Sequence, residues 1–328
     1  MLTKIAEAFA PAAISNFFAS EGPNLHFERE GDLSRVGATG GGFTLSAGVH
    51  SRVTLLNGSS ARRVRISVNG DPTYAARTTS LALRLLVEST RAKFDTLILD
   101  QNVEVPIGHG FGASAASALS AVIAASSALG LHMSKERVAY FAHAADILAQ
   151  TGMGTVSAIY DASGAGVMTR AGGPGVAEFL RVKVPGGLKL VTASLAPFQK
   201  RDVLSSNAMR SKVRRLGEVA LRMFQADPTF QTLCGAGEWF ARNLGLETEE
   251  VKSLIRLAKG NGAMHASQNM IGYAIHSVAR EEDIAGLVTK LGSSSMLPWV
   301  QVYDFGASKA DVIREFVADY PTVTSSLV

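Results

Sequence analysis

Short alternations of apolar and polar residues dominate the N-terminal third of the chain and predict β-strands. Residues 74–89 instead repeat apolar side chains at helical spacing, with Leu81, Leu85 and Leu86 on one face. Strands therefore predominate here, with a helix among them. The strand-like runs cover 43–46, 49–56, 62–68 and 94–105, with glycine-rich turns between several of them.

Helical periodicity takes over after residue 112. A helix is predicted over 113–129 and closed by Gly130, and Ser134 is a suitable N-cap for another helix over 135–149. A short helix follows at 155–163. After it, residues 167–169 and 179–184 have the pattern of a hairpin.

The turn at 185–187, Pro-Gly-Gly, is the best candidate for a domain junction. Because strands and helices are grouped without strict alternation, we expect an α+β fold with two domains, residues 1–185 and 186–328. Beyond the junction the pattern predicts strands at 188–193 and 299–305 and helices at 207–225, 284–291 and 308–318, with a mostly helical passage up to 257.

Composition excludes several classes of protein. With 328 residues, 47% of them hydrophobic and 18% charged, the chain can bury a sizeable core and is not a disordered protein. The net charge of +4 is scattered, and the basic clusters at 62–65 and 212–215 lack interleaved aromatic residues. Anionic small molecules are therefore expected as partners, and nucleic acid is not.

Cysteine usage and the terminal sequence suggest a location. The single cysteine, Cys234, leaves no disulfide and indicates a reducing compartment. The first residues lack the layout of a signal peptide. The longest weakly polar run, 113–131, is rich in serine, alanine and glycine, so it predicts a buried helix and no membrane span. We expect a cytoplasmic protein without a membrane partner.

The segment that carries most chemical information is 106–120, Pro-Ile-Gly-His-Gly-Phe-Gly-Ala-Ser-Ala-Ala-Ser-Ala-Leu-Ser, between a predicted strand and a predicted helix. Glycines permit positive φ angles and close approach of a ligand. The unpaired N–H groups at the start of the following helix, together with its dipole, favour an anion such as phosphate. No Gly-Lys-Ser/Thr closes the loop, so it differs from the usual P-loop.

Several segments resemble motifs of the GHMP kinases, the superfamily of galactokinase, homoserine kinase and mevalonate kinase. Residues 106–120 are similar to the second motif, and 8–18, Ala-Phe-Ala-Pro-Ala-Ala-Ile-Ser-Asn-Phe-Phe, to the first. The resemblance implies an N-terminal domain similar to the second domain of a ribosomal protein, a ferredoxin-like C-terminal domain, and an active site between them. The chain resembles the archaeal pantoate kinase branch in particular, in four segments: 111–116, 142–146, 151–156 and 267–272.

The resemblance also implies ATP and Mg²⁺ as cofactors. Ser114 would supply a hydroxyl ligand to Mg²⁺, and Asp146 would occupy the acidic ligand position, which is usually Glu. A hard cation that also holds phosphates needs only one or two protein oxygens, which fits this pair. The residues expected to contact ATP are Pro106, Gly108, His109, Gly110, Phe111, Gly112, Ala113, Ser114 and Ala115.

Two departures from the family pattern concern the acceptor. The first motif usually carries a basic or imidazole residue after Pro-Gly, and this chain has Pro11-Ala12-Ala13. Pantoate kinases have an Asp expected to contact the reacting hydroxyl, and this chain has Thr155, which cannot act as a base near pH 7. Either phosphoryl transfer needs no dedicated base, because its transition state is loose, or the acceptor differs from pantoate.

We weigh the second account more heavily. Exchanging a carboxylate for a hydroxyl removes repulsion against an anionic acceptor, especially one that is already phosphorylated. Among members of the resembled family, the archaeal mevalonate-pathway kinase that phosphorylates the 5-hydroxyl of mevalonate 3-phosphate fits this exchange, so the resemblance makes it the main expectation. Its acceptor, like pantoate, is a branched hydroxy acid with a primary hydroxyl. Pantoate, in coenzyme A biosynthesis, is the alternative acceptor. A nucleotide-binding sensor without catalysis is the third option, and a homodimer is left open.

The catalytic residues are expected to be Ser114, Asp146 and Thr155. A helix N-cap is a competing role for Thr155, compatible with substrate contact. His143, which shares a helix face with Asp146, is expected to make a structural hydrogen bond. Contacts to the acceptor are expected from Ser15, Asn16, Thr155, Lys200 and Arg201.

Overall fold

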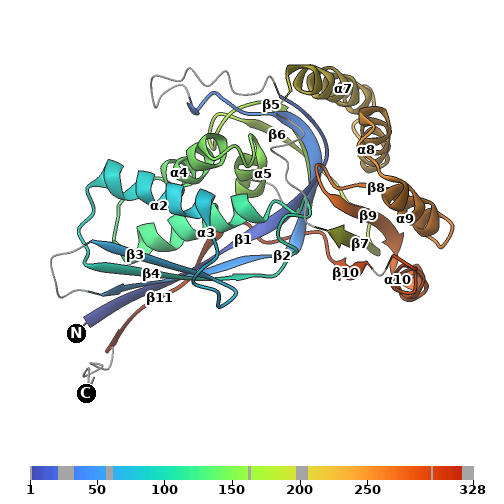
Figure 1. Cartoon of the computed structure of the whole chain (residues 1–328). Helices are drawn as coiled ribbons and strands as arrows, with labels where there is room; N and C mark the ends of the chain where they lie inside the picture. Colours follow the sequence, from blue (N-terminus) through green and yellow to red (C-terminus); the bar gives the residue numbers. More distant parts are fainter. Residues whose placement is uncertain are drawn as a thin grey trace.

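The structure is a computed structural model that describes residues 2–20, 33–56, 62–161, 164–196, 206–296 and 298–319. Its strands form two sheets with helices packed against them (Figure 1). Strands and helices are mixed without strict alternation along the chain, which confirms the predicted α+β fold class.

The larger sheet contains two strands of 18 residues, β1 (Leu2–Ala19) and β2 (Thr39–Leu56), paired antiparallel. The predicted runs 43–46 and 49–56 are thus one strand, which extends back through the glycines at 40–42. A Cβ on Gly42 would lie 2.1 Å from the Ile14 carbonyl oxygen, so glycine is what lets the two backbones meet. The other strands are β3 (Arg63–Val68), β4 (Thr96–Val103), β5 (Ala165–Arg170), β6 (Glu178–Val182) and β11 (Asp311–Asp319).

Among the described residues the order of this sheet is β11-β1-β2-β4-β3, and β5 pairs with β2 and β6. Helices α2 (Arg77–Thr90), α3 (Ala113–Ala128), α4 (Lys135–Leu148) and α5 (Thr155–Asp161) cover one face of the sheet (Figure 1). The predicted N-cap of α4 is confirmed, since Ser134 Oγ accepts a hydrogen bond from Arg137 N at 3.2 Å.

Helix α3 lies at the centre of this layer, and most of its side chains are buried. Alanine and serine allow such close packing on every side because they have little volume. Ser120, which is fully buried, has the partner that a buried hydroxyl requires, since its Oγ lies 2.7 Å from Ser51 Oγ on β2. The prediction of a buried helix in the small-residue run is therefore confirmed.

The smaller sheet has four strands in the described chain, in the order β10-β7-β9-β8, all antiparallel. One of its faces forms a separate core with α9 and α10 that includes Val191, Ile275, Leu254 and Leu287. Its elements are β7 (Leu188–Ala196), α7 (Asn207–Ala226), α8 (Phe230–Leu244), α9 (Glu249–Lys259), β8 (His265–Gln268), β9 (Tyr273–Arg280), a short 3₁₀ turn (Glu281–Asp283), α10 (Ile284–Gly292) and β10 (Trp299–Tyr303).

The prediction of a final helix over 308–318 is wrong, because this segment forms strand β11. It pairs antiparallel with β1, from Leu2↔Asp319 to Phe9↔Asp311. The expected domain boundary at 185/186 falls between β6 and β7, but β11 returns the end of the chain to the first sheet. The partner of this strand lies some 300 residues away in the sequence. Such long-range pairing cannot be predicted from the local spacing of apolar residues.

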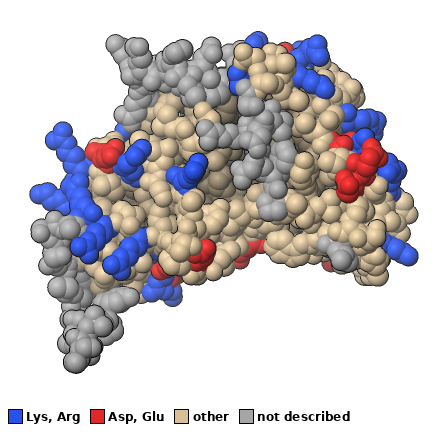
Figure 2. All heavy atoms as spheres, in the orientation of Figure 1, with Lys and Arg blue, Asp and Glu red and all other residues tan. Residues whose placement is uncertain are grey.

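On the face of the molecule that Figure 2 shows, charged side chains lie in two separate regions. Figure 2 shows Lys and Arg gathered over the α2–β3 end of one face and mixed with Asp and Glu over α7 to α9, with an uncharged middle. None of the helices in the described ranges combines the length and apolar character needed to cross a bilayer.

Helix α7 packs against β1 through Gly217, and we predict that a larger side chain at this contact lowers the stability of the protein. A Cβ on Gly217 would lie 2.0 Å from Phe18 O, whereas a Cβ on Gly235 of α8 would meet nothing within 4 Å. Gly217→Ala should lower the free energy of unfolding by about 1–3 kcal/mol through overpacking. Gly235→Ala should raise it by about 0.5–1 kcal/mol through helix propensity. Urea unfolding of both variants checks this, and equal shifts of the same sign would contradict the packing described.

Candidate active site

The glycine loop, residues 106–112, connects β4 to α3 in a backbone conformation that glycine adopts easily. Gly108, Gly110 and Gly112 have φ angles of 85°, 84° and 66°. The first amide of α3 bonded within the helix is that of Ala116, to Gly112 O at 3.1 Å. The preceding amides, 113–115, are at the positive end of the helix dipole. This arrangement suits a phosphate.

The loop is fixed from the N-terminal side by β1 and α5. Ala13 N donates a hydrogen bond to Phe111 O at 3.0 Å. A Cβ on Gly112 would lie 2.9 Å from Thr155 Cγ2 and 3.1 Å from Ala13 O. Both departures from the family pattern, at Ala13 and Thr155, therefore lie directly against the glycine loop.

Residues 269–272 hold the loop from the second sheet. Asn269 Nδ2 donates to His109 O at 3.3 Å, and its Oδ1 lies 3.0 Å from His276 Nδ1. Burial lowers the pKa of His276 to about 4, so its ring is neutral at physiological pH. The Nδ2 of Asn269 donates to a carbonyl, so the Oδ1 of the same side chain is the atom that faces His276. Because this oxygen can only accept a hydrogen bond, His276 Nδ1 carries the proton. Glycine is required here too, since a Cβ on Gly272 would lie 2.6 Å from His109 O.

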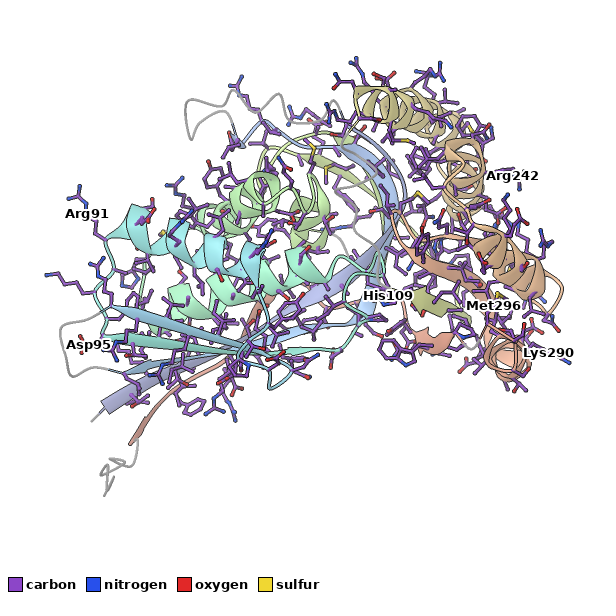
Figure 3. All side chains as sticks on the ribbon, in the orientation of Figure 1. Arg91, Asp95, His109, Arg242, Lys290 and Met296 are labelled. Atoms are coloured by element: carbon purple, nitrogen blue, oxygen red, sulfur yellow. The ribbon has the colours of Figure 1, made fainter. Side chains whose placement is uncertain are left out.

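Most side chains expected to contact ATP are packed inside the protein, so the loop presents mainly backbone. Phe111 is 1% exposed and meets Tyr303 edge-on, with ring centroids 6.1 Å apart. Pro106, Ala113 and Ala115 are buried as well. His109 is half-buried where the two sheets approach one another (Figure 3), and burial lowers its pKa.

A pocket of about 440 Å³ adjoins the loop. Its lining residues include some from the larger sheet, from α7 and from the turn between β8 and β9 of the smaller sheet. Ala13, Ser15 and Thr155 line it at the end near the glycine loop. Arg210 of α7 is the one charged side chain among the described residues that line it. Its apolar walls include Phe17, Phe18, Met153, Met168, Phe179 and Ile271.

The structure brings only some of the expected acceptor residues to this pocket. Asn16 is fully buried on the opposite side of β1, and a Cβ on Gly237 of α8 would lie 2.6 Å from Asn16 Cβ. Ser15 lines the pocket, whereas Asn16 lies at an irregularity of the β1–β2 register and packs against α8, so the two residues do not share a pocket. Lys200 and Arg201 lie outside the described residues. Sequence reasoning missed Arg210, although its i, i+3, i+7 spacing with Val213 and Gly217 marks one face of a helix.

Asp146 is held rigidly beneath the pocket. It is 1% exposed, and its Oδ1 accepts a hydrogen bond from Thr151 Oγ1 at 2.6 Å. Thr151 Oγ1 is in turn 2.9 Å from Thr78 Oγ1 on α2. A Cβ on Gly152 would lie 2.3 Å from Asp146 Oδ2, so only glycine fits above the carboxylate. Ser114 is half-buried in the first turn of α3.

Comparisons with known proteins agree with this geometry. Residues 76–163 match the family of GHMP kinases N terminal domains. The pantoate kinase of Thermococcus kodakarensis is 27% identical over 295 residues, which cover 89% of this chain and 93% of that protein. The pantoate kinase of Methanospirillum hungatei is 26% identical, with 86% and 90% covered. A solved phosphotransferase related to the CoA biosynthesis pathway has a TM-score of 0.81 at 24% identity, with 95% and 98% covered.

The chain belongs to the GHMP kinase superfamily. It falls in the pantoate kinase-like branch and is an ATP-dependent kinase that acts on a hydroxyl group of a small molecule. In this GHMP kinase Thr155 lines the pocket and also lies directly against Gly112 of the glycine loop. Thr155 opens α5, so it does not act as the N-cap of that helix.

His143 of this GHMP kinase makes the structural hydrogen bond that we predict. Its Nε2 lies 3.1 Å from Leu33 O and 3.0 Å from Val36 O, so this nitrogen carries the proton. Burial lowers the pKa of the ring. The histidine thus anchors the segment that leads into β2, whose first residues line the pocket.

Gly112→Ala should impair the use of ATP more than it impairs folding. The substitution forces a side chain into a left-handed conformation, at about 1–2 kcal/mol, and against Thr155. Gly70→Ala is the matched control, because Gly70 also has positive φ but has nothing within 4 Å of its Cβ position. We expect a loss of at least about tenfold in kcat/KM for ATP in the first variant only. Equal kinetics in the two variants would show that Gly112 does not shape the donor loop.

Proposed function

We propose that this GHMP kinase phosphorylates the primary hydroxyl of pantoate with ATP. The observation that carries the proposal is the pocket beside the glycine loop, which is mostly apolar and has a single charged side chain among its described lining residues. An acid with one carboxylate and a branched apolar carbon chain matches that lining. Two relatives that align over most of the chain, the pantoate kinases described above, bear this activity in their names.

Mevalonate 3-phosphate, our main expectation from the sequence, has weaker support. That acceptor carries a phosphate in addition to its carboxylate, and each buried anion requires a partner. Arg210 alone offers a full positive charge among the described lining residues. The alternative acceptor, pantoate, therefore fits better. The kinase relatives also favour an enzyme over a sensor without catalysis.

The proposed mechanism relies on positioning. The acceptor oxygen attacks the γ-phosphorus of ATP, the new P–O bond forms, the bond to the β-phosphate oxygen breaks, and ADP leaves with that electron pair. Because the transition state is loose, the hydroxyl proton can leave late and pass to solvent or to a phosphoryl oxygen. Thr155 takes no proton in this scheme. Its hydroxyl orients the acceptor next to Gly112, and the amides at 113–115 stabilise the charge that develops on the phosphates.

Ser114 and Asp146 would hold Mg²⁺ when it is bound with ATP. Hydroxyl and carboxylate oxygens are the donors that this hard cation prefers, and the phosphates supply further oxygens. The hydrogen bond from Thr151 keeps one Asp146 oxygen at a fixed position, which suits a ligand shorter than the usual Glu. Mg²⁺ would neutralise part of the phosphate charge. The cytoplasmic location and the homodimer stay predictions from the sequence.

The acceptor is tested by offering the purified protein pantoate, mevalonate and mevalonate 3-phosphate in turn with Mg-ATP. We expect ADP release with pantoate and a phosphorylated product that retains the carboxylate. Mass spectrometry of the product and a coupled ADP assay measure this. Turnover with mevalonate 3-phosphate and none with pantoate would overturn the proposal and restore the earlier expectation.

Ser114→Ala should weaken the dependence on Mg²⁺, with a loss of about 100-fold in turnover, as for other single groups that stabilise transition-state charge. Ser127→Ala is the control, since Ser127 lies in the same helix and its Oγ has no hydrogen-bond partner among the described residues. Calorimetric titration of ATP with and without Mg²⁺ gives a readout independent of activity. If Mg²⁺ enhances ATP binding equally in both variants, Ser114 is not a ligand.

A further inference from the structure

We propose that Arg210 binds the carboxylate of the acceptor and thereby sets which end of the substrate faces ATP. This inference rests on the proposed function. It assigns the two ends of the pocket: the carboxylate lies against α7, and the primary hydroxyl lies against Thr155 and the glycine loop. Arg210 is then a specificity-determining residue for anionic acceptors.

The packing of α7 places Arg210 toward the pocket. Residues 210, 213 and 217 lie on one face of the helix, because they are separated by three and seven positions. Gly217 of this face abuts Phe18 and Ala19 of β1, and Val213 is 2% exposed and lines the pocket. Arg210 is the remaining member of the same face, half-buried and also in the pocket wall.

Arg214, four residues after Arg210 on α7, lies in a different environment. Arg214 Nε bonds Glu218 Oε1 at 3.0 Å, and their side chains are 51% and 44% exposed. This is an ordinary i, i+4 pair on the solvent side of the helix. Two arginines four residues apart thus differ in environment, one at the surface and one at an apolar pocket, which provides a matched control.

The chemistry of the pocket explains why a carboxylate would select Arg210. A carboxylate placed among Phe17, Phe18 and Met153 would be costly without a cationic partner. A guanidinium binds a carboxylate through two parallel hydrogen bonds, which fixes orientation as well as charge. Asn207 Oδ1 accepts a hydrogen bond from Arg210 Nη2 and steadies the side chain. Arg210 also lies in the first turn of α7, where the helix dipole favours an anion.

The opposite end of the pocket offers no comparable cation among the described residues. Ala13, Ser15 and Thr155 are neutral, and Thr155 contacts Gly112 of the donor loop. A hydroxyl is the end of the acceptor that suits these groups. The orientation with the carboxylate at α7 therefore brings the reacting oxygen to the phosphate side without placing a second anion beside ATP.

The experiment compares pantoate with its uncharged amide in the wild type and in Arg210→Ala, Arg210→Lys and Arg214→Ala. In Arg210→Ala we expect KM for pantoate to rise about 10- to 100-fold, as for loss of a charged hydrogen bond, with KM for ATP unchanged. The preference for pantoate over the amide should fall toward unity. Arg210→Lys should recover part of the preference, and Arg214→Ala should behave as the wild type.

Two outcomes overturn the inference. One is an Arg210→Ala variant that keeps the wild-type preference for the acid, and the other is an equal loss of preference in Arg214→Ala. Arg210→Gln gives the same comparison if the alanine variant does not fold. Failure of the proposed function is seen separately, as a wild type that releases no ADP with pantoate. The acid that the wild type does accept and its amide then replace the pantoate pair, and the same criteria apply.

Discussion

Close contact between backbones around the glycine loop is the constraint on which the rest of the site depends. Gly112 touches Ala13 and Thr155, while Gly272 touches His109 from the second sheet. No side chain larger than hydrogen fits at these contacts. Three segments from distant parts of the chain therefore converge on one loop, and the amides at the start of α3 keep a fixed direction.

The same constraint joins the donor and acceptor halves of the reaction. Thr155 belongs to the wall of the pocket and to the surroundings of Gly112, so in the proposed function an acceptor hydroxyl near Thr155 would also be near the phosphates. Positioning of this kind can replace a dedicated base when the transition state is loose. The exchange of the family aspartate for threonine is then compatible with catalysis, and it does not by itself require a different acceptor.

Local patterns predicted the elements better than they predicted side-chain roles. The helices over 113–129 and 135–149 follow from periodicity and capping, and both are present. The segment 308–318 was predicted as a helix but forms β11, because its hydrogen bonds go to β1 at the other end of the chain. The sequence groups Asn16 with Ser15 as an acceptor contact, yet Asn16 lies at an irregularity in the β1–β2 register and packs against α8.

The sequence by itself determined the glycine loop and the helix that follows it, because a strand-to-helix turn of this kind is a local feature that depends on adjacent residues and suits a phosphate. Family resemblance added the kinase class and the pair Ser114 and Asp146. Only the tertiary structure decided the pocket beside that loop. Phe18, Thr155 and Arg210 come from distant segments. Their assembly into one apolar pocket, with one positively charged side chain among its described lining residues, depends on long-range packing.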